Sequence, residues 1–138
     1  MRIRNVFKLA VLMAVMLGMT GCVFFWDNDI SVVKFIVDGE EFTEELLELQ
    51  AGQEVNIKIE VFTYFGQKVN NCIVTWELEH GTDIIGTLNK QDGYEVTFTA
   101  ADAIEKSISG SIAVTVESPV IGTIIEETLQ IKVEPAEQ

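Results

Sequence analysis

The chain has 138 residues, of which 48% are hydrophobic, and its 22 acidic residues outweigh nine Lys and Arg to give a net charge of −13. A protein this acidic repels phosphate backbones, which argues against nucleic acid as a partner. Two cysteines, Cys22 and Cys72, and one histidine, His80, are a poor set of ligands for zinc. The length is enough for one domain with a single hydrophobic core.

The first 21 residues have the layout of an export signal. Arg2, Arg4 and Lys8 precede an apolar run over residues 9–19, and small residues follow it. The run is too short for a membrane-spanning helix, which needs about 20 apolar residues. We therefore expect residues 1–21 to be a signal peptide and the chain to be exported.

The signal ends in Met19-Thr20-Gly21-Cys22, which resembles the bacterial lipobox. In that motif a small residue precedes a cysteine that is acylated and becomes the first residue of the mature protein; Met19 departs from the usual Leu. The resemblance implies a lipoprotein attached through Cys22 to the cell membrane or the outer membrane. After cleavage, six lysines would face 22 acidic residues, a net charge of −16.

Residues 22–29 are predicted to be the lipidated cysteine and a short tether. They contain no Ser- and Gly-rich spacer, and the eight residues from Cys22 to Ile30 reach at most about 28 Å when extended. The domain is therefore expected close to its membrane. Phe24, Phe25 and Trp26 would lie near the lipid headgroups, where aromatic side chains are stable.

From residue 30 onward, apolar and polar residues alternate with a period of two, which predicts strands with one face in a core. Turn residues such as Asp92-Gly93 and Ser118-Pro119 separate the segments. We expect an all-β sandwich of about seven antiparallel strands over residues 30–134, followed by a tail at 135–138. The predicted strands lie within residues 33–37, 55–61, 74–78, 84–88, 94–98, 112–116 and 129–133.

Residues 43–50 depart from this alternation. Phe42, Leu46 and Leu49 have helical spacing, and the glutamates between them favour a helix. The segment therefore predicts either one helical turn or the edge of a strand.

Several short stretches between Leu49 and Val133 carry a family resemblance. They are the run 49–53 before the second predicted strand, Val74-Thr75-Trp76, Gly86-Thr87-Leu88, and the runs 96–100 and 129–133. Together they resemble a bacterial immunoglobulin-like (Big-type) domain of the kind repeated in surface adhesins, without the cysteine pair of antibody domains. The resemblance implies a sandwich fold and a surface setting, and it implies no activity.

Trp76 and Cys72 are both expected to be structural. Trp76 lies between Val74 and Leu78 on the apolar face of a predicted strand, which favours the core over a ligand site. If Cys22 is acylated, Cys72 has no intramolecular partner, and its place at the start of an apolar stretch predicts a buried, unreactive thiol.

No residue set predicts catalysis or a cofactor. His80 and Asp83 fall in an expected exposed turn, which supplies neither the desolvation nor the partners that a general acid or base needs. Calcium is the one metal with candidate ligands, Asp27 and Asp29, although their spacing does not match a calcium-binding loop.

An immunoglobulin-like topology would bring two apolar loops to the tethered end of the domain. They carry Tyr64 and Phe65 in one loop, and Val120 and Ile121 in the other. We expect these side chains, with Phe24, Phe25 and Trp26, to form a patch that rests on lipid or binds a partner at the membrane. The alternative is that Tyr64 and Phe65 cover the core and the other two extend the strands.

The sequence thus predicts a membrane-anchored surface or envelope lipoprotein, with a non-catalytic domain for binding, adhesion or assembly and a protein or glycan as its partner. The alternative is an accessory subunit of a transport or hydrolase system that captures a ligand such as a glycan. A concave face with exposed aromatic side chains would favour that alternative.

Overall fold

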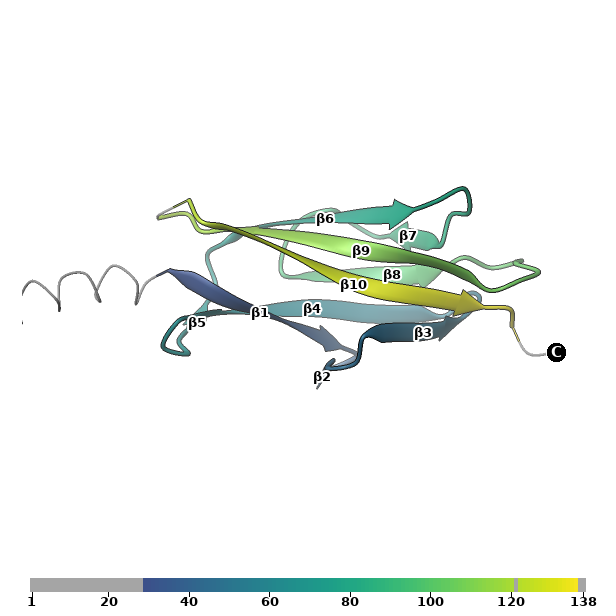
Figure 1. Cartoon of the computed structure of the whole chain (residues 1–138), viewed down its shortest axis with the longest axis horizontal. Coiled ribbons are helices and arrows are strands. Elements are labelled where there is room, and N and C mark those ends of the chain that lie inside the picture. Colours follow the sequence, from purple (N-terminus) through teal and green to yellow (C-terminus); the bar gives the residue numbers. More distant parts are fainter. Residues whose placement is uncertain (1–28, 121, 137–138) are drawn as a thin grey trace, which may run out of the picture.

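The computed structural model describes residues 29–120 and 122–136, which form two β-sheets stacked face to face (Figure 1). This arrangement confirms the predicted all-β sandwich. Within the described ranges, no helix is long and apolar enough to cross a membrane.

The first sheet contains six strands in the order β2-β1-β4-β8-β7, with β5 paired to β4. Their bounds are β1 (Ile30–Val37), β2 (Glu40–Glu41), β4 (Glu54–Thr63), β5 (Lys68–Val69), β7 (Gly86–Leu88) and β8 (Glu95–Ala100). The second sheet has the order β3-β10-β9-β6. Its strands are β3 (Leu46–Gln50), β6 (Ile73–His80), β9 (Ile108–Glu117) and β10 (Ile124–Glu134).

The strand order identifies the topology. The path β1-β4-β8-β7 corresponds to strands A, B, E and D of an immunoglobulin domain, and β6, β9 and β10 correspond to C, F and G. Neighbours along these paths are antiparallel, whereas β3 crosses to the second sheet and runs parallel to β10. The fold is therefore immunoglobulin-like, as the sequence predicts.

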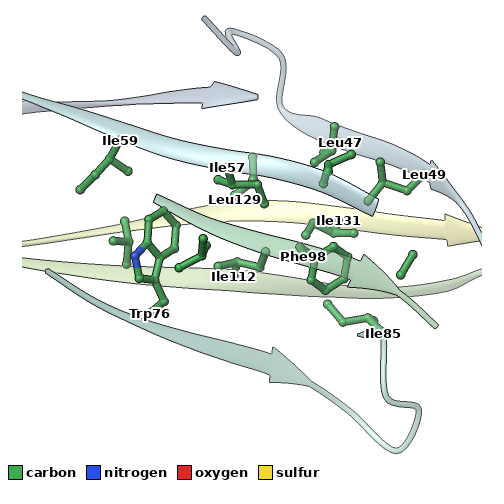
Figure 2. Close-up of a cluster of buried hydrophobic side chains, with 14 of the residues drawn as sticks. Leu47, Leu49, Ile57, Ile59, Trp76, Ile85, Phe98, Ile112, Leu129 and Ile131 are labelled. Carbon is green, nitrogen blue, oxygen red and sulfur yellow. The ribbon is translucent and has the colours of Figure 1, made fainter. Parts of the chain in front are cut away.

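The core lies between the two sheets and is built by the predicted alternation. On β4, every second side chain is buried, from Val55 to Val61, while the residues between them are partly exposed. Ile57 and Ile59 of this strand face Trp76 and Ile112 of the second sheet (Figure 2). Because no disulfide is present among the described residues, the sheets are held together by this packing.

The described part of the chain has ten strands rather than about seven, and one pairing is parallel. All seven predicted strands are present, and the additional strands are β2, β3 and β5. β2 and β5 are two residues long and follow tight turns, at Asp38-Gly39 and at Gly66, where φ is positive. Two residues are too few for alternation to reveal.

The helical turn predicted over residues 43–50 is wrong, and the alternative of a strand edge is correct. Leu47 and Leu49 point into the core as alternate residues of β3, while Leu46 and Glu48 are exposed. The β3 backbone pairs with residues 130–134 of β10. This pairing and the burial of two leucines outweigh the helix propensity of the glutamates.

Trp76 lies in the core as predicted, with 1% of its surface exposed. The prediction of a buried Cys72 needs correction, because this free cysteine is half-buried and lies just before β6. Its side chain packs at the margin of the core, and the next residue, Ile73, faces outward. The apolar stretch therefore becomes a core strand only at Val74.

Candidate functional site

Two loops flank the point where the described chain begins. Ile30, the first residue of β1, pairs with Thr63 at the end of β4. Asp29 accepts a hydrogen bond through Oδ2 from Thr123 Oγ1, at 2.9 Å, in the loop before β10. The β4–β5 and β9–β10 loops therefore lie on either side of the start of β1, at the left of Figure 1. We call this end of the sandwich the proximal end.

Large apolar side chains are exposed on both loops of the proximal end. Tyr64 and Phe65 are 68% and 56% exposed, and Val120 is 78% exposed. The rings of Tyr64 and Phe65 meet edge to face with their centroids 5.3 Å apart. Tyr64 and Phe65 therefore do not cover the core as a lid, and Val120 lies between β9 and β10 rather than in a strand.

Four residues of the predicted patch lie outside the described residues. They are Ile121, Phe24, Phe25 and Trp26. Cys22 and Asp27, the predicted lipid attachment site and one calcium candidate, lie outside them as well.

Two isoleucines extend the exposed apolar surface in a way that the sequence analysis missed. Ile73 and Ile124 are each 58% exposed. Both pair with Glu117 of β9, so they stand on either side of it in the cross-strand row nearest the proximal end. The outward direction of Ile73 follows from the period of two, since Val74 and Trp76 face the core. Ile124 lies before the predicted strand at 129–133, so no predicted strand covers it.

Charged residues are absent from the sequences of the proximal loops. Residues 63–67, 69–76 and 118–125 contain no Asp, Glu, Lys or Arg. Two longer segments elsewhere in the sandwich are charged: residues 38–45 contain five acidic residues, and residues 101–107 contain Asp102, Glu105 and Lys106. The proximal loops thus differ in charge from these two segments of an acidic domain.

Tyr94 holds the connection between β5 and β6 in place. Its hydroxyl donates to the carbonyl of Val69 at 2.9 Å and accepts from the backbone N–H of Cys72 at 3.0 Å. Burial raises the pKa of the Tyr94 phenol from 10.0 to about 12, with further contributions from neighbouring Cys72. Sequence reasoning placed this residue only on a strand.

We expect the stability of the domain to fall as the pH rises from about 10 toward 12, because Tyr94 titrates at lower pH in the unfolded chain than in the folded one. The stabilisation that the neutral phenol contributes is fully present at pH values below the pKa of the unfolded chain. It is lost as the pH rises through the pKa of the folded chain. Denaturant unfolding across this pH range, on wild type and Tyr94→Phe, measures the effect. Equal slopes with pH for the two proteins would contradict it.

Asp29 is the one calcium candidate in the described region. Its Oδ1 atom is buried and has no hydrogen-bond partner among the described residues. The same region contains no group of three or more His, Cys, Asp and Glu side chains that could hold a metal ion. Calcium binding at this position therefore remains a prediction from the sequence, and thermal unfolding with millimolar calcium or a chelator would test it.

The far end of the sandwich contains an open groove of about 610 Å³. Ile84, Ile104 and Ile108 give it an apolar lining, with Asp83, Glu105 and Lys106 beside them. We call this the distal end. No aromatic side chain lines the groove, so it lacks the feature that would favour the glycan-capturing alternative.

His80 and Asp83 do not form a catalytic arrangement. His80 is the last residue of β6, and Asp83 lies in the connection that follows it. Both side chains are exposed to solvent. Neither makes a side-chain hydrogen bond or an ion pair in the described part of the chain that would orient it for proton transfer.

A scan against protein-family models and a search of curated proteins found no match. Among solved structures, domains 4 and 5 of the S-layer protein SbsC align with 79% of this chain and 53% of that one, at 12% identity and a TM-score of 0.43. The titin M3 domain aligns over 77% of this chain and 100% of its own, at 15% identity and a TM-score of 0.32. A collagen adhesin from S. aureus aligns over 82% and 45%, at 12% identity and a TM-score of 0.24. The chain spans about half the length of the S-layer and adhesin structures.

Proposed function

We propose that this chain is an exported bacterial lipoprotein whose bacterial immunoglobulin-like domain is a non-catalytic module for binding, adhesion or envelope assembly. Residues 1–21 are removed, Cys22 is acylated, and residues 22–29 hold the domain at the surface of the cell membrane or outer membrane. The observation that carries this proposal is the position of Cys22. It follows a short apolar export signal directly and stands seven residues before Asp29, where the described domain begins.

The positions of the histidine and the free cysteine support the proposal that the domain is non-catalytic. The histidine is solvent-exposed at the end of an edge strand, and Cys72 is half-buried in the connection between β5 and β6. The fold itself carries no activity, since immunoglobulin-like sandwiches serve many unrelated roles. The module is therefore expected to act through its surface.

Replacing Cys22 with alanine tests the proposed anchor. In a bacterial host that lipidates exported proteins, wild type should incorporate labelled palmitate and partition into the detergent phase. Cys22→Ala should lose the label entirely, because no acyl acceptor remains at the cleavage site.

The second cysteine supplies a matched control. Cys72 lies within the folded domain, so Cys72→Ala should keep both the label and the membrane fractionation. Label in Cys22→Ala equal to that in wild type, or no label in wild type, would show that the chain is not a lipoprotein attached at this residue.

A further inference from the structure

The exposed apolar side chains of the domain are gathered at one end. Of the eight large apolar residues that are exposed in the described region, only Leu46 and Ile84 lie elsewhere. The six at or next to the proximal end are Val32, Tyr64, Phe65, Ile73, Val120 and Ile124. Scattered exposed apolar residues are ordinary, whereas a concentration on a single end marks a surface that is covered in the functional state.

The loops that carry these side chains are held by the sandwich. Thr63, next to Tyr64, is buried, and its backbone N–H donates to Gln67 O while Gly66 N–H donates to Thr63 O. In the other loop, Ser118 N–H donates to Thr123 O, and Thr123 Oγ1 is bonded to Asp29. The apolar side chains are thus presented on closed turns, which lowers the entropy cost of placing them against another surface.

The electrostatics of the proximal end suit an interface with lipid. Its loop sequences carry no charge, so the loop tips can leave water without desolvating an ion. Lys68, three residues after Phe65, forms an ion pair with Glu60 at 3.6 Å. Glu117 lies one row behind the tips, between Ile73 and Ile124. A carboxylate in that position limits penetration to the headgroup region, where aromatic rings are favourable.

The length of the preceding chain determines which surface is within reach. Asp29 is seven positions after Cys22, a distance of at most about 25 Å when the chain is extended. Asp29 is bonded to one apolar loop, and the next residue pairs with the end of the strand that leads into the other. An acyl chain on Cys22 would therefore keep both loops next to the same bilayer.

We propose that the proximal end docks on the bilayer that holds the lipid anchor, with Tyr64, Phe65 and Val120 entering the headgroup region. This inference rests on the proposed function, since it needs the acylated Cys22. Docking by two loops on opposite sheets holds the long axis of the sandwich upright, along the membrane normal. The distal groove is then directed away from the membrane, toward a partner.

Depth-dependent quenching of tryptophan fluorescence tests the docking. The lipidated protein is placed in phosphatidylcholine vesicles with brominated acyl chains, and Trp26→Phe removes the tryptophan of the tether. In this background, Phe65→Trp and Val120→Trp report on the proximal loops, and Ile84→Trp, at an exposed distal position, is the matched control. Buried Trp76 is common to all three proteins. We expect quenching of both proximal tryptophans to exceed that of the distal one several-fold.

Two results would overturn the inference and leave the lipoprotein proposal intact. One is equal quenching at the proximal and distal positions, measured in protein that still sediments with the vesicles. That result would mean that the domain tumbles on its tether. The other result combines two measurements on a proximal tryptophan: brominated lipid does not quench it, and on intact cells it is shielded from a soluble quencher. That combination would assign this end of the domain to a protein partner. Failure of the wild-type protein to acquire lipid would overturn the proposed function as well.

Discussion

Replacing Trp76 with alanine should lower the free energy of unfolding by about 3–5 kcal/mol, a large share of the roughly 5–15 kcal/mol that stabilises a typical domain. The side chain is 1% exposed and is the largest in the core. Its ring lies 6.5 Å from that of Phe35, centroid to centroid, so it contacts both sheets. Truncation removes these contacts and leaves a cavity that the surrounding strands cannot fill.

The indole also makes a hydrogen bond, and its contribution to stability can be measured separately from that of the packing. Its Nε1 donates to the carbonyl of Gly93 at 2.7 Å, which holds the β7–β8 connection against the edge of β6. Trp76→Phe keeps most of the packing and loses this bond, so we expect a smaller loss of stability than for Trp76→Ala.

Urea unfolding followed by circular dichroism measures the three proteins without relying on the replaced tryptophan. Tyr64→Ala, at an exposed loop position, is the control and should change stability by no more than about 0.5 kcal/mol. A loss for Trp76→Ala no greater than for Tyr64→Ala would mean that the core does not depend on this residue.

The main strands could be predicted because each buries one face, and burial of one face imposes a period of two on the sequence. The alternation of Val55, Ile57, Ile59 and Val61 is repeated in the structure as alternating buried and exposed side chains. For β3 the sequence left a helical turn and a strand edge as alternatives. Its partner, β10, lies at the other end of the domain sequence, and local propensity alone does not include the energy of a pairing formed across the fold.

The proximal loops were predictable in part. Tyr64, Phe65 and Val120 stand between recognisable strands, so their place in loops followed from the strand positions. Whether these side chains fold inward or point outward depends on the turns that carry them, and alternation contains no information on turns. The Asp29–Thr123 bond and the clamp formed by Tyr94 join residues distant in sequence, and no local pattern marks them.

Replacing Gly86 with alanine should destabilise the domain by about 3 kcal/mol, at the upper end of the effects of overpacking a core. A Cβ atom at this position would lie 2.6 Å from Cζ of Phe98 and would clash with the backbone carbonyl of Thr99. Phe98 is fully buried and Thr99 belongs to the paired strand β8, so neither can move aside without disturbing the core.

Gly81 is the matched control for this substitution, since it lies five residues earlier in the chain and a Cβ atom there would meet nothing within 4 Å. Neither glycine has a positive φ, so the two alanine variants differ in steric contact and not in backbone strain. Gly81→Ala should leave the urea midpoint nearly unchanged, whereas Gly86→Ala should lower it sharply with the same m-value. Equal midpoints for the two variants would mean that β7 does not pack as closely against β8 as these contacts require.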